Sequence, residues 1–121
     1  MTIIFYLIFS LILGVLAGTI TGLIPGIHIN LIAIALLSVS AYLLNITTPL
    51  ILIIFIISMA ITHTFIDYIP SIFLGAPDED SILSILPGHK LLLEGKAYFA
   101  LIFTLYGSIT ALLIIILFAP L

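Results

Sequence analysis

The chain has 121 residues, of which 64% are hydrophobic and 6% are charged, and its formal net charge is −3. Soluble domains are about one-quarter charged residues, so two basic and five acidic side chains could not cover a soluble fold of this length. The composition therefore predicts an all-α integral membrane protein, and it excludes nucleic-acid binding, which needs a basic surface. The absence of cysteine from the sequence excludes disulfides and thiolate metal sites.

The apolar runs predict three to four transmembrane helices, because about 20 apolar residues cross the hydrocarbon core of a bilayer. Within a single membrane domain, 1–121, we expect spans at about 3–24, 27–44, 49–69 and 97–119. All five acidic and both basic residues lie between Asp67 and Lys96. The segment 70–96 is therefore predicted to be polar and broken by proline and glycine, and to be either re-entrant or interfacial.

Glycine recurs at every fourth position of the first span, as Gly14, Gly18 and Gly22. These residues lie close to one face of a helix, and such a stripe lets a second helix approach closely and pack through dispersion contacts. We expect a general helix-packing face here. A specific dimer interface is the alternative, because a GxxxG pattern alone is weak evidence for one.

Pro25 and Gly26 are expected to break the first helix, since proline removes a backbone donor and glycine adds conformational freedom. Apolar sequence resumes almost at once, which leaves two interpretations. The chain either turns tightly at one membrane face or forms one helix that is interrupted within the bilayer. In the second case the free backbone groups line a watery cavity, together with the side chains of His28 and Asn30.

The third span is predicted to begin with Thr48 as its N-cap and Pro49 as its first residue, and to end at Pro70. His63 and Asp67 are four residues apart, so they share a helix face and can pair. An acid inside a span is costly and points to function, for example in a proton relay. The alternative is that Asp67 lies at the headgroup level and only solvates the helix end.

The segment after Gly75 has the signature of a helix start, with Pro77 followed by Asp78, Glu79 and Asp80. The acidic triplet either complements the helix dipole or forms an oxygen-rich cation site or a proton-coupled carboxylate.

The short helix that starts there is expected to stop at Leu86, because Pro87 and Gly88 follow it. A second short helix is expected from His89 to Glu94, closed by Gly95.

Interrupted helices often mark a solute site in membrane transporters, because their ends present free N–H and C=O groups. The chain has no arginine, so a carboxylate solute would be held mainly by such backbone groups. Gly26, Gly75 and Gly88 are places where a ligand could approach the backbone closely. Turn formation alone is the simpler explanation of these glycines.

Two motifs resemble a known family. Residues 18–26 read Gly-x-x-x-Gly-Leu-Ile-Pro-Gly, and Ser71 to Pro77 is followed by Gly88 and by Gly-Lys-Ala at 95–97. In order and spacing these resemble the large permease subunit, TctA, of tripartite tricarboxylate transporters, in a divergent archaeal-type branch and over its N-terminal half only. The chain departs from the family pattern at His28, at His89 and at the acidic triplet 78–80.

The resemblance implies a membrane transport protein of the cell membrane, part or half of a permease for di- or tricarboxylates, and not an enzyme. The residues expected to bind the solute are Pro25, Gly26, His28, Asn30, Gly75, Pro77 and Gly88. The residues expected to couple an ion are His63, Asp67, Asp78 and Asp80. The alternative is a non-transporting small membrane subunit or a truncated fragment.

No cofactor, catalytic residue or metal site is expected, and the coupling ion is expected to be Na⁺ or H⁺. The expected partners are the lipid bilayer, a second permease half or a second copy of the chain, and, by family resemblance, a solute-binding protein. An intramembrane enzyme is not expected, because His63 and Asp67 lack a third side chain with a clear catalytic role.

Overall fold

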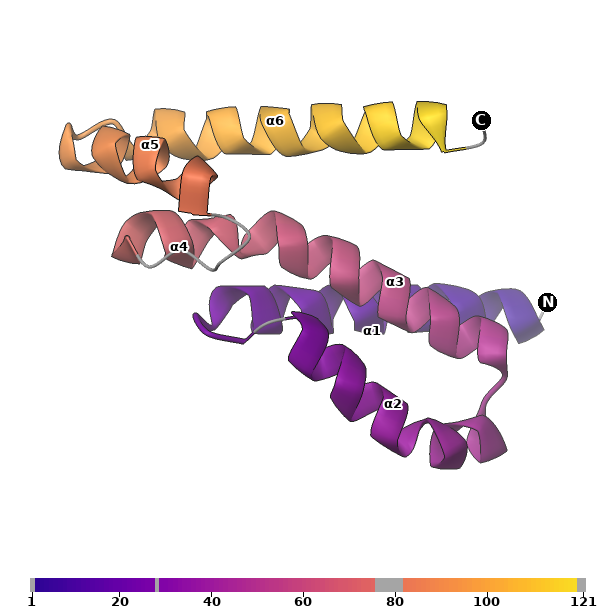
Figure 1. Ribbon diagram of the computed structural model, residues 1–121. Helices are drawn as coiled ribbons and strands as arrows, with labels where there is room; N and C mark the ends of the chain where they lie inside the picture. The colour runs from indigo at the N-terminus through magenta and orange to yellow at the C-terminus, as the bar shows by residue number, and fades with distance from the viewer. Residues whose placement is uncertain (1, 28, 76–81, 120–121) are drawn as a thin grey trace. The chain divides into compact units, whose positions relative to one another are not determined.

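The computed structural model describes residues 2–27, 29–75 and 82–119, and every regular element within these ranges is a helix (Figure 1). The helices are α1 (Thr2–Leu23), α2 (Ile29–Ile46), α3 (Pro49–Ile66), α4 (Tyr68–Leu74), α5 (Ile82–Leu93) and α6 (Ala97–Phe118). Four stretches are long and apolar enough to cross a membrane: Ile3–Leu23, Ile29–Ile46, Pro49–Leu74 and Ala97–Phe118. The all-α membrane fold with three to four spans is confirmed.

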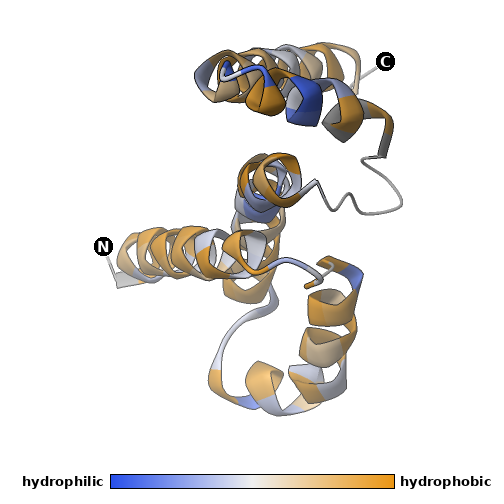
Figure 2. Cartoon of the chain, turned by 90° about the vertical axis from the view of Figure 1, so that its left-hand side faces the viewer, coloured by the Kyte–Doolittle hydropathy of each residue, from blue (hydrophilic) through white to orange (hydrophobic). Residues whose placement is uncertain are grey.

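The chain divides into two compact units, Met1–Asp67 and Tyr68–Leu121, which are described separately below as the N-terminal unit and the C-terminal unit. Hydrophobic residues cover the long helices, as the orange colouring in Figure 2 shows. Many of their large apolar side chains are exposed, for example Leu37 and Leu117. An apolar outer surface is what a helix in contact with lipid requires.

In the N-terminal unit, α1 and α3 lie side by side and run parallel. The hydroxyl of Ser10 donates a hydrogen bond to the carbonyl oxygen of Ile51 at 2.7 Å. Twelve residues further along α1, Gly22 lies against Ile66 near the end of α3. Residue numbers increase in the same direction on both helices from one contact to the next, so α1 and α3 are parallel. The connecting helix α2 runs in the opposite direction (Figure 1).

The glycine stripe is the surface of α1 that packs on α3, which confirms the predicted helix-packing face. Gly14, Gly18 and Gly22 are all buried. A Cβ atom added to Gly14 would lie 2.5 Å from the carbonyl oxygen of Phe55, and one added to Gly22 would lie 2.8 Å from that of His63. At Gly18 the added atom would overlap the carbonyl oxygen of Met59. Only glycine therefore lets the two backbones approach this closely.

The turn after α1 is as sharp as Pro25 and Gly26 predict. Gly26 has φ +84°, in the left-handed region that favours glycine, and the amide of Ile27 donates to the carbonyl of Ile24 at 3.3 Å. Figure 1 shows α2 heading back toward the end of the unit where α1 begins. The reversal favours a tight turn between two helices over a single helix interrupted along its length.

The predicted end of the third span at Pro70 is wrong. Thr48 and Pro49 begin α3 as predicted, but the helix ends at Ile66, and α4 then runs through Pro70. The reason is steric, because a proline ring crowds the carbonyl of the residue four positions earlier, which here is Ile66. The helix is interrupted there for a single residue, Asp67, and Pro70 falls in the first turn of α4, where no N–H is needed.

The predicted stop at Leu86 is also wrong, since α5 continues through Pro87 to Leu93. Proline here removes one helical hydrogen bond, to the carbonyl of Leu83, but does not end the helix. Gly95 closes α5 as predicted, with φ +76°. The amide of Gly95 donates to Leu92 at 2.9 Å and that of Lys96 to Leu91 at 2.8 Å, which is the Schellman pattern. The predicted helix start at 76–81 lies outside the described residues.

The packing at Gly18 predicts a specific loss of stability. We expect Gly18→Ala to lower the free energy of unfolding by about 1–3 kcal/mol, because the new methyl group overlaps the backbone of α3. The measurement is unfolding of the micelle-bound protein by sodium dodecyl sulfate, followed by circular dichroism.

Gly107→Ala in α6 is the matched control, because an added Cβ there meets nothing within 4 Å. This change should be neutral or stabilise by up to about 1 kcal/mol, since alanine is the better helix former. Equal effects of the two substitutions would contradict the close α1–α3 contact.

Candidate functional site

Four of the predicted site residues gather at one end of the N-terminal unit. Gly22, next to the end of α1, packs against His63 and Ile66 at the end of α3, so the two helices end beside each other. Pro25 and Gly26 follow α1 directly, and Asp67 follows α3 directly. The parallel arrangement of the two helices therefore brings the Pro-Gly turn and the His63–Asp67 segment to the same end, although they are about 40 residues apart in sequence.

His63 is the most enclosed polar group at this end, with only 4% of its surface exposed. Its Nδ1 atom lies 3.0 Å from the hydroxyl oxygen of Thr21 on α1. The same hydroxyl donates to the carbonyl oxygen of Gly18 at 3.2 Å. Sequence reasoning missed Thr21, although its place between two glycines of the stripe puts it near the packing face. The backbone amide of Asp67 donates to the carbonyl of His63 at 2.9 Å, and pairing of their side chains stays a prediction.

The remaining solute-binding residues predicted for this end are outside the core of the unit. Pro25, Gly26 and Asn30 are exposed, and His28 lies outside the described residues. A Cβ atom added to Gly26 would meet nothing within 4 Å, so glycine is needed there for its backbone conformation and not for a close contact. Its predicted contact with a solute stays a prediction.

In the C-terminal unit, two of the predicted glycines hold α4 against α5. Gly88 is buried, and an added Cβ would lie 3.1 Å from the side chain of Ile72. Gly75 has φ +63°, and an added Cβ would lie 2.8–3.1 Å from three atoms of the His89 ring. Both positions therefore require glycine for packing between these helices, as well as for turn formation at Gly75.

His89, to which sequence reasoning gave no role, caps the end of α4. Its Nδ1 atom lies 2.8 Å from the carbonyl oxygen of Ile72, so the ring nitrogen donates and the carbonyl accepts. Ile72 is in the last turn of α4, where carbonyl groups lack helical partners, and its side chain is fully buried. The sequence signal was the Pro-Gly-His run itself, because the adjacent Gly88 allows α5 to approach α4 closely.

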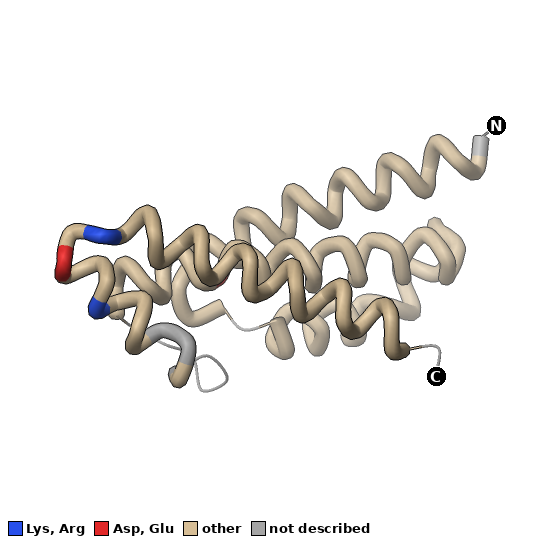
Figure 3. Tube along the Cα trace, turned by 90° about the horizontal axis from the view of Figure 1, so that it is seen from above, with Lys and Arg blue, Asp and Glu red and all other residues tan. Residues whose placement is uncertain are grey.

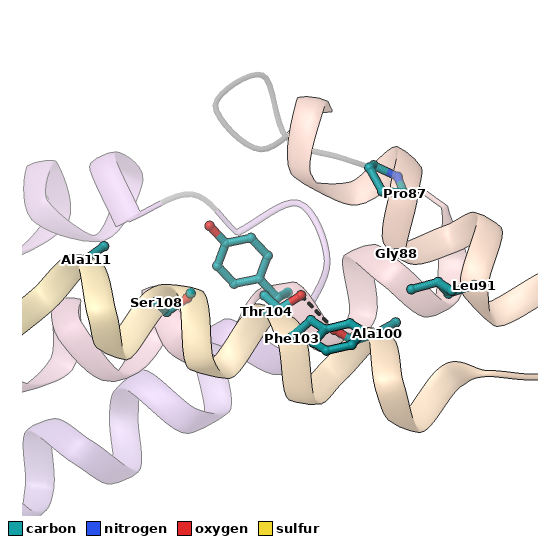
Figure 4. A pocket seen from close by; sticks show the side chains of 10 residues that line it. Pro87, Gly88, Leu91, Ala100, Phe103, Thr104, Ser108 and Ala111 are labelled. Atoms are coloured by element: carbon teal, nitrogen blue, oxygen red, sulfur yellow. Dashed lines mark hydrogen bonds between the residues drawn. The ribbon is translucent and has the colours of Figure 1, made fainter.

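A cleft of about 420 Å³ lies within the C-terminal unit (Figure 4). Its lining residues are Tyr68, Pro87, Gly88, Leu91, Ala100, Phe103, Thr104, Gly107, Ser108 and Ala111. The lining carries three hydroxyl groups and no charged side chain. Thr104 donates to the carbonyl of Ala100 at 2.9 Å, which leaves its oxygen able to accept a second bond. Gly88 is the one predicted solute-binding residue in this lining.

Three of the four charged residues that the structure describes lie on α5 or in the turn that follows it. Lys96 donates to a carboxylate oxygen of Glu94 at 3.1 Å, at the turn between α5 and α6 (Figure 3). Lys90 is exposed on α5. The predicted residues Pro77, Asp78 and Asp80 lie outside the described residues. Within ranges 2–27, 29–75 and 82–119, no three potential metal-ligating side chains come together.

The fold defines a multi-pass helical membrane protein. The chain belongs to the tripartite tricarboxylate transporter TctA family, which it matches over residues 8–121. It is also 50% identical, over 54 residues, to an uncharacterized protein of Methanocaldococcus jannaschii. The aligned region is 45% of this chain and 14% of that relative. No solved structure matches.

These findings confirm the resemblance deduced from the motifs, including its archaeal character. The family is one of transporters with partner subunits, so the chain is placed in a membrane transport context.

The contact of Gly75 with His89 generates a prediction about local stability. Gly75→Ala should accelerate hydrogen exchange in α4 and α5, because the methyl group displaces the His89 ring and removes its bond to Ile72. Loss of one such hydrogen bond between α4 and α5 should increase the exchange rate of backbone amides in these two helices by about tenfold.

Gly95→Ala is the control, because Gly95 also has a positive φ but an added Cβ meets nothing within 4 Å. It carries the same backbone strain without the contact, and its effect should stay at the end of α5. An identical exchange pattern in both variants would mean that His89 does not hold α4.

Proposed function

We propose that this chain is part of a permease that carries small organic anions, such as di- or tricarboxylates, across the cell membrane. The observation that supports this most strongly is the match to the TctA family over residues 8–121. The four span-capable helices provide the membrane-embedded part that such a function needs. The substrate class is suggested by the family description.

The cleft of the C-terminal unit is the proposed contact surface for the solute. Its hydroxyl groups on Tyr68 and Ser108 can donate hydrogen bonds to carboxylate oxygens, whereas that of Thr104 is donated to Ala100 and can only accept from a hydroxyl group of the solute. Neither lysine of the chain is among its lining residues. A carboxylate bound there would need its negative charge offset by another group, and a co-transported cation is the simplest source of that charge. Gly75 and Pro77 are proposed as further solute-binding residues on the basis of the sequence motif alone.

The proposed coupling ion is Na⁺ or H⁺. His63 and Asp67 lie at the end of the N-terminal unit where the chain also turns at Pro25 and Gly26, and His28 and Asn30 follow this turn in sequence. Ionisable groups in or next to membrane spans are costly to insert and often carry protons or ions. Asp78 and Asp80 are proposed as further coupling carboxylates on the basis of their sequence context.

The chain is proposed to act together with further helices, from a second permease half or a second copy, and with a solute-binding protein. Among the described residues, the buried apolar side chains are Met59, Ile72 and Ala100. So small a core is not enough for these helices to enclose a solute pathway by themselves. The same observation favours the alternative function, a non-transporting subunit that stabilises a larger membrane complex.

The transport proposal is tested by uptake of radiolabelled citrate and succinate into cells that express the chain together with a second permease half and a solute-binding protein. Uptake above that of cells without the chain is expected. If uptake is absent although the protein is present in the membrane and cross-links to other subunits, the subunit alternative is favoured.

The role of the cleft is tested by removing its two donor hydroxyl groups with Tyr68→Phe and Ser108→Ala. Each lost hydrogen bond to the solute is expected to weaken the apparent affinity by about three- to tenfold, measured as the concentration for half-maximal uptake. Thr110→Val is the matched control, because Thr110 is absent from the cleft lining and its hydroxyl bonds to Tyr106 of its own helix at 2.7 Å. A control that weakens uptake as much as the cleft variants would remove the cleft from the solute site.

Ion coupling is tested with Asp67→Asn, and separately with Asp78→Asn combined with Asp80→Asn. At least one of these variants should lose the dependence of uptake on Na⁺ or pH, with a fall of about tenfold in uptake. Glu94→Gln is the control, because Glu94 is 41% exposed and pairs with Lys96. Normal uptake and ion dependence in both acidic-site variants would exclude these carboxylates from coupling.

A further inference from the structure

His63 is a titratable side chain buried within a membrane span. It belongs to the stretch Pro49–Leu74, which is long and apolar enough to cross a bilayer. It lies where α1 packs closely on α3, since Cβ atoms added to Gly18 and Gly22 would both contact backbone atoms of His63. The packing of apolar helices does not require an imidazole at this place, so its hydrogen bonds deserve a functional explanation.

The hydroxyl of Thr21 lies within hydrogen-bonding distance of both the Gly18 carbonyl and the ring of His63. A threonine hydroxyl has a single proton, and that of Thr21 is donated to the carbonyl oxygen of Gly18 at 3.2 Å. When the hydroxyl proton stays in this bond, the Thr21 oxygen is the acceptor in its 3.0 Å contact with Nδ1 of His63. Nδ1 is then the protonated nitrogen of the neutral ring, and Nε2 carries the lone pair.

We propose that Thr21 is a positioning residue for His63, holding the neutral ring in the Nδ1–H tautomer so that Nε2 is the atom that takes up and releases a proton. This inference rests on the proposed function, in which His63 takes part in ion coupling. Proton uptake adds an N–H bond at Nε2 and leaves the Nδ1–H bond to Thr21 in place. Both charge states thus keep the same contact between α1 and α3, and proton transfer does not require the helices to separate.

The surroundings of His63 leave few other groups that could interact with its charge. The only titratable side chain of α1 is Tyr6, near the opposite end of the helix, and that of α2 is Tyr42, in its last turns. Asp67, one helical turn beyond His63, is the only acid in sequence positions 1–67. His28 is the other titratable side chain of this unit and lies outside the described residues. Thr21 is therefore the described α1 side chain that can direct the protonation of His63.

The direct test is ¹⁵N nuclear magnetic resonance of histidine-labelled protein in lipid nanodiscs at alkaline pH. The signals of His63 are identified by their loss in His63→Gln. Wild-type protein should show a protonated Nδ1 and an unprotonated Nε2. Thr21→Val, which keeps the side-chain shape but removes the hydroxyl, should shift the tautomer ratio toward Nε2–H by about tenfold. Thr21→Ser should retain the wild-type ratio.

Thr19→Val is the matched control, because the Thr19 hydroxyl bonds within α1 to Val15 at 2.9 Å. Its tautomer ratio should equal that of the wild type. A wild-type ring protonated at Nε2 would overturn the proposal, and so would an unchanged ratio in Thr21→Val. Should Thr21→Val not fold, as judged by circular dichroism, the wild-type and Thr21→Ser spectra decide the matter.

A second readout separates positioning from a purely structural role. In the uptake assay, Thr21→Val should change the dependence of uptake on pH, because the ring of His63 loses its hydroxyl partner, and Thr21→Ser should restore the wild-type profile. Uptake by the wild type with an unchanged Thr21→Val profile would refute the positioning role and leave the proposed function intact. Absence of uptake in the wild type, with the expected tautomers, would refute the proposed function alone.

Discussion

The close parallel contact of α1 with α3 is the constraint on which the N-terminal unit depends. In lipid, apolar side chains gain nothing by leaving the solvent, so helices associate through tight van der Waals packing and hydrogen bonds. Gly14, Gly18 and Gly22 provide the packing by letting backbone meet backbone. Hydrogen bonds cross the same interface near both ends of the glycine stripe, from Ser10 to Ile51 and between Thr21 and His63. By contrast, none of the residues of α2 is buried, and this apolar helix connects α1 to α3.

This contact also explains why polar residues that are far apart in sequence share one end of the unit. The register of α1 on α3 sets the level of the Pro-Gly turn relative to His63 and Asp67. In the C-terminal unit, glycines likewise permit close helix packing, because Gly75 and Gly88 allow α5 to approach α4. In each unit a histidine binds an oxygen atom of the neighbouring helix through its Nδ1 atom. The chain belongs to a family of transporters, and the hydroxyl-lined cleft lies beside the second of these two glycine–histidine arrangements.

The sequence was enough to predict features that depend on composition and local geometry. Apolar length predicts the helical membrane fold, and the need for a positive φ predicts the ends at Gly26 and Gly95. The helix ends predicted at Pro70 and Pro87 were wrong, because the effect of a proline depends on its distance from the start of a helix. At Pro70 the chain restarts a helix just before the ring, and at Pro87 one lost hydrogen bond is tolerated.

Features that depend on a second helix could not be predicted. The glycine stripe indicates a packing face but not that α3 is its partner, and the roles of Thr21 and His89 follow from atoms on neighbouring helices. The same holds for the cleft, whose hydroxyl groups come from Tyr68 on α4 and from Thr104 and Ser108 on α6. The acidic positions 78 and 80 lie outside the described residues, so their assignment still rests on sequence alone.

The central claim, that α1 packs parallel to α3 with Gly22 against Ile66, is most directly tested by disulfide crosslinking in native membranes. The chain has no cysteine of its own, so each introduced pair is read without background. A Cβ added to Gly22 would lie 2.9 Å from the Cβ of Ile66, so a small adjustment brings the pair Gly22→Cys and Ile66→Cys into disulfide geometry. The account predicts rapid formation of an intramolecular disulfide by this pair and none by Gly22→Cys with Ile51→Cys. Crosslinking of the second pair instead of the first, or disulfides that form only between chains, would contradict it.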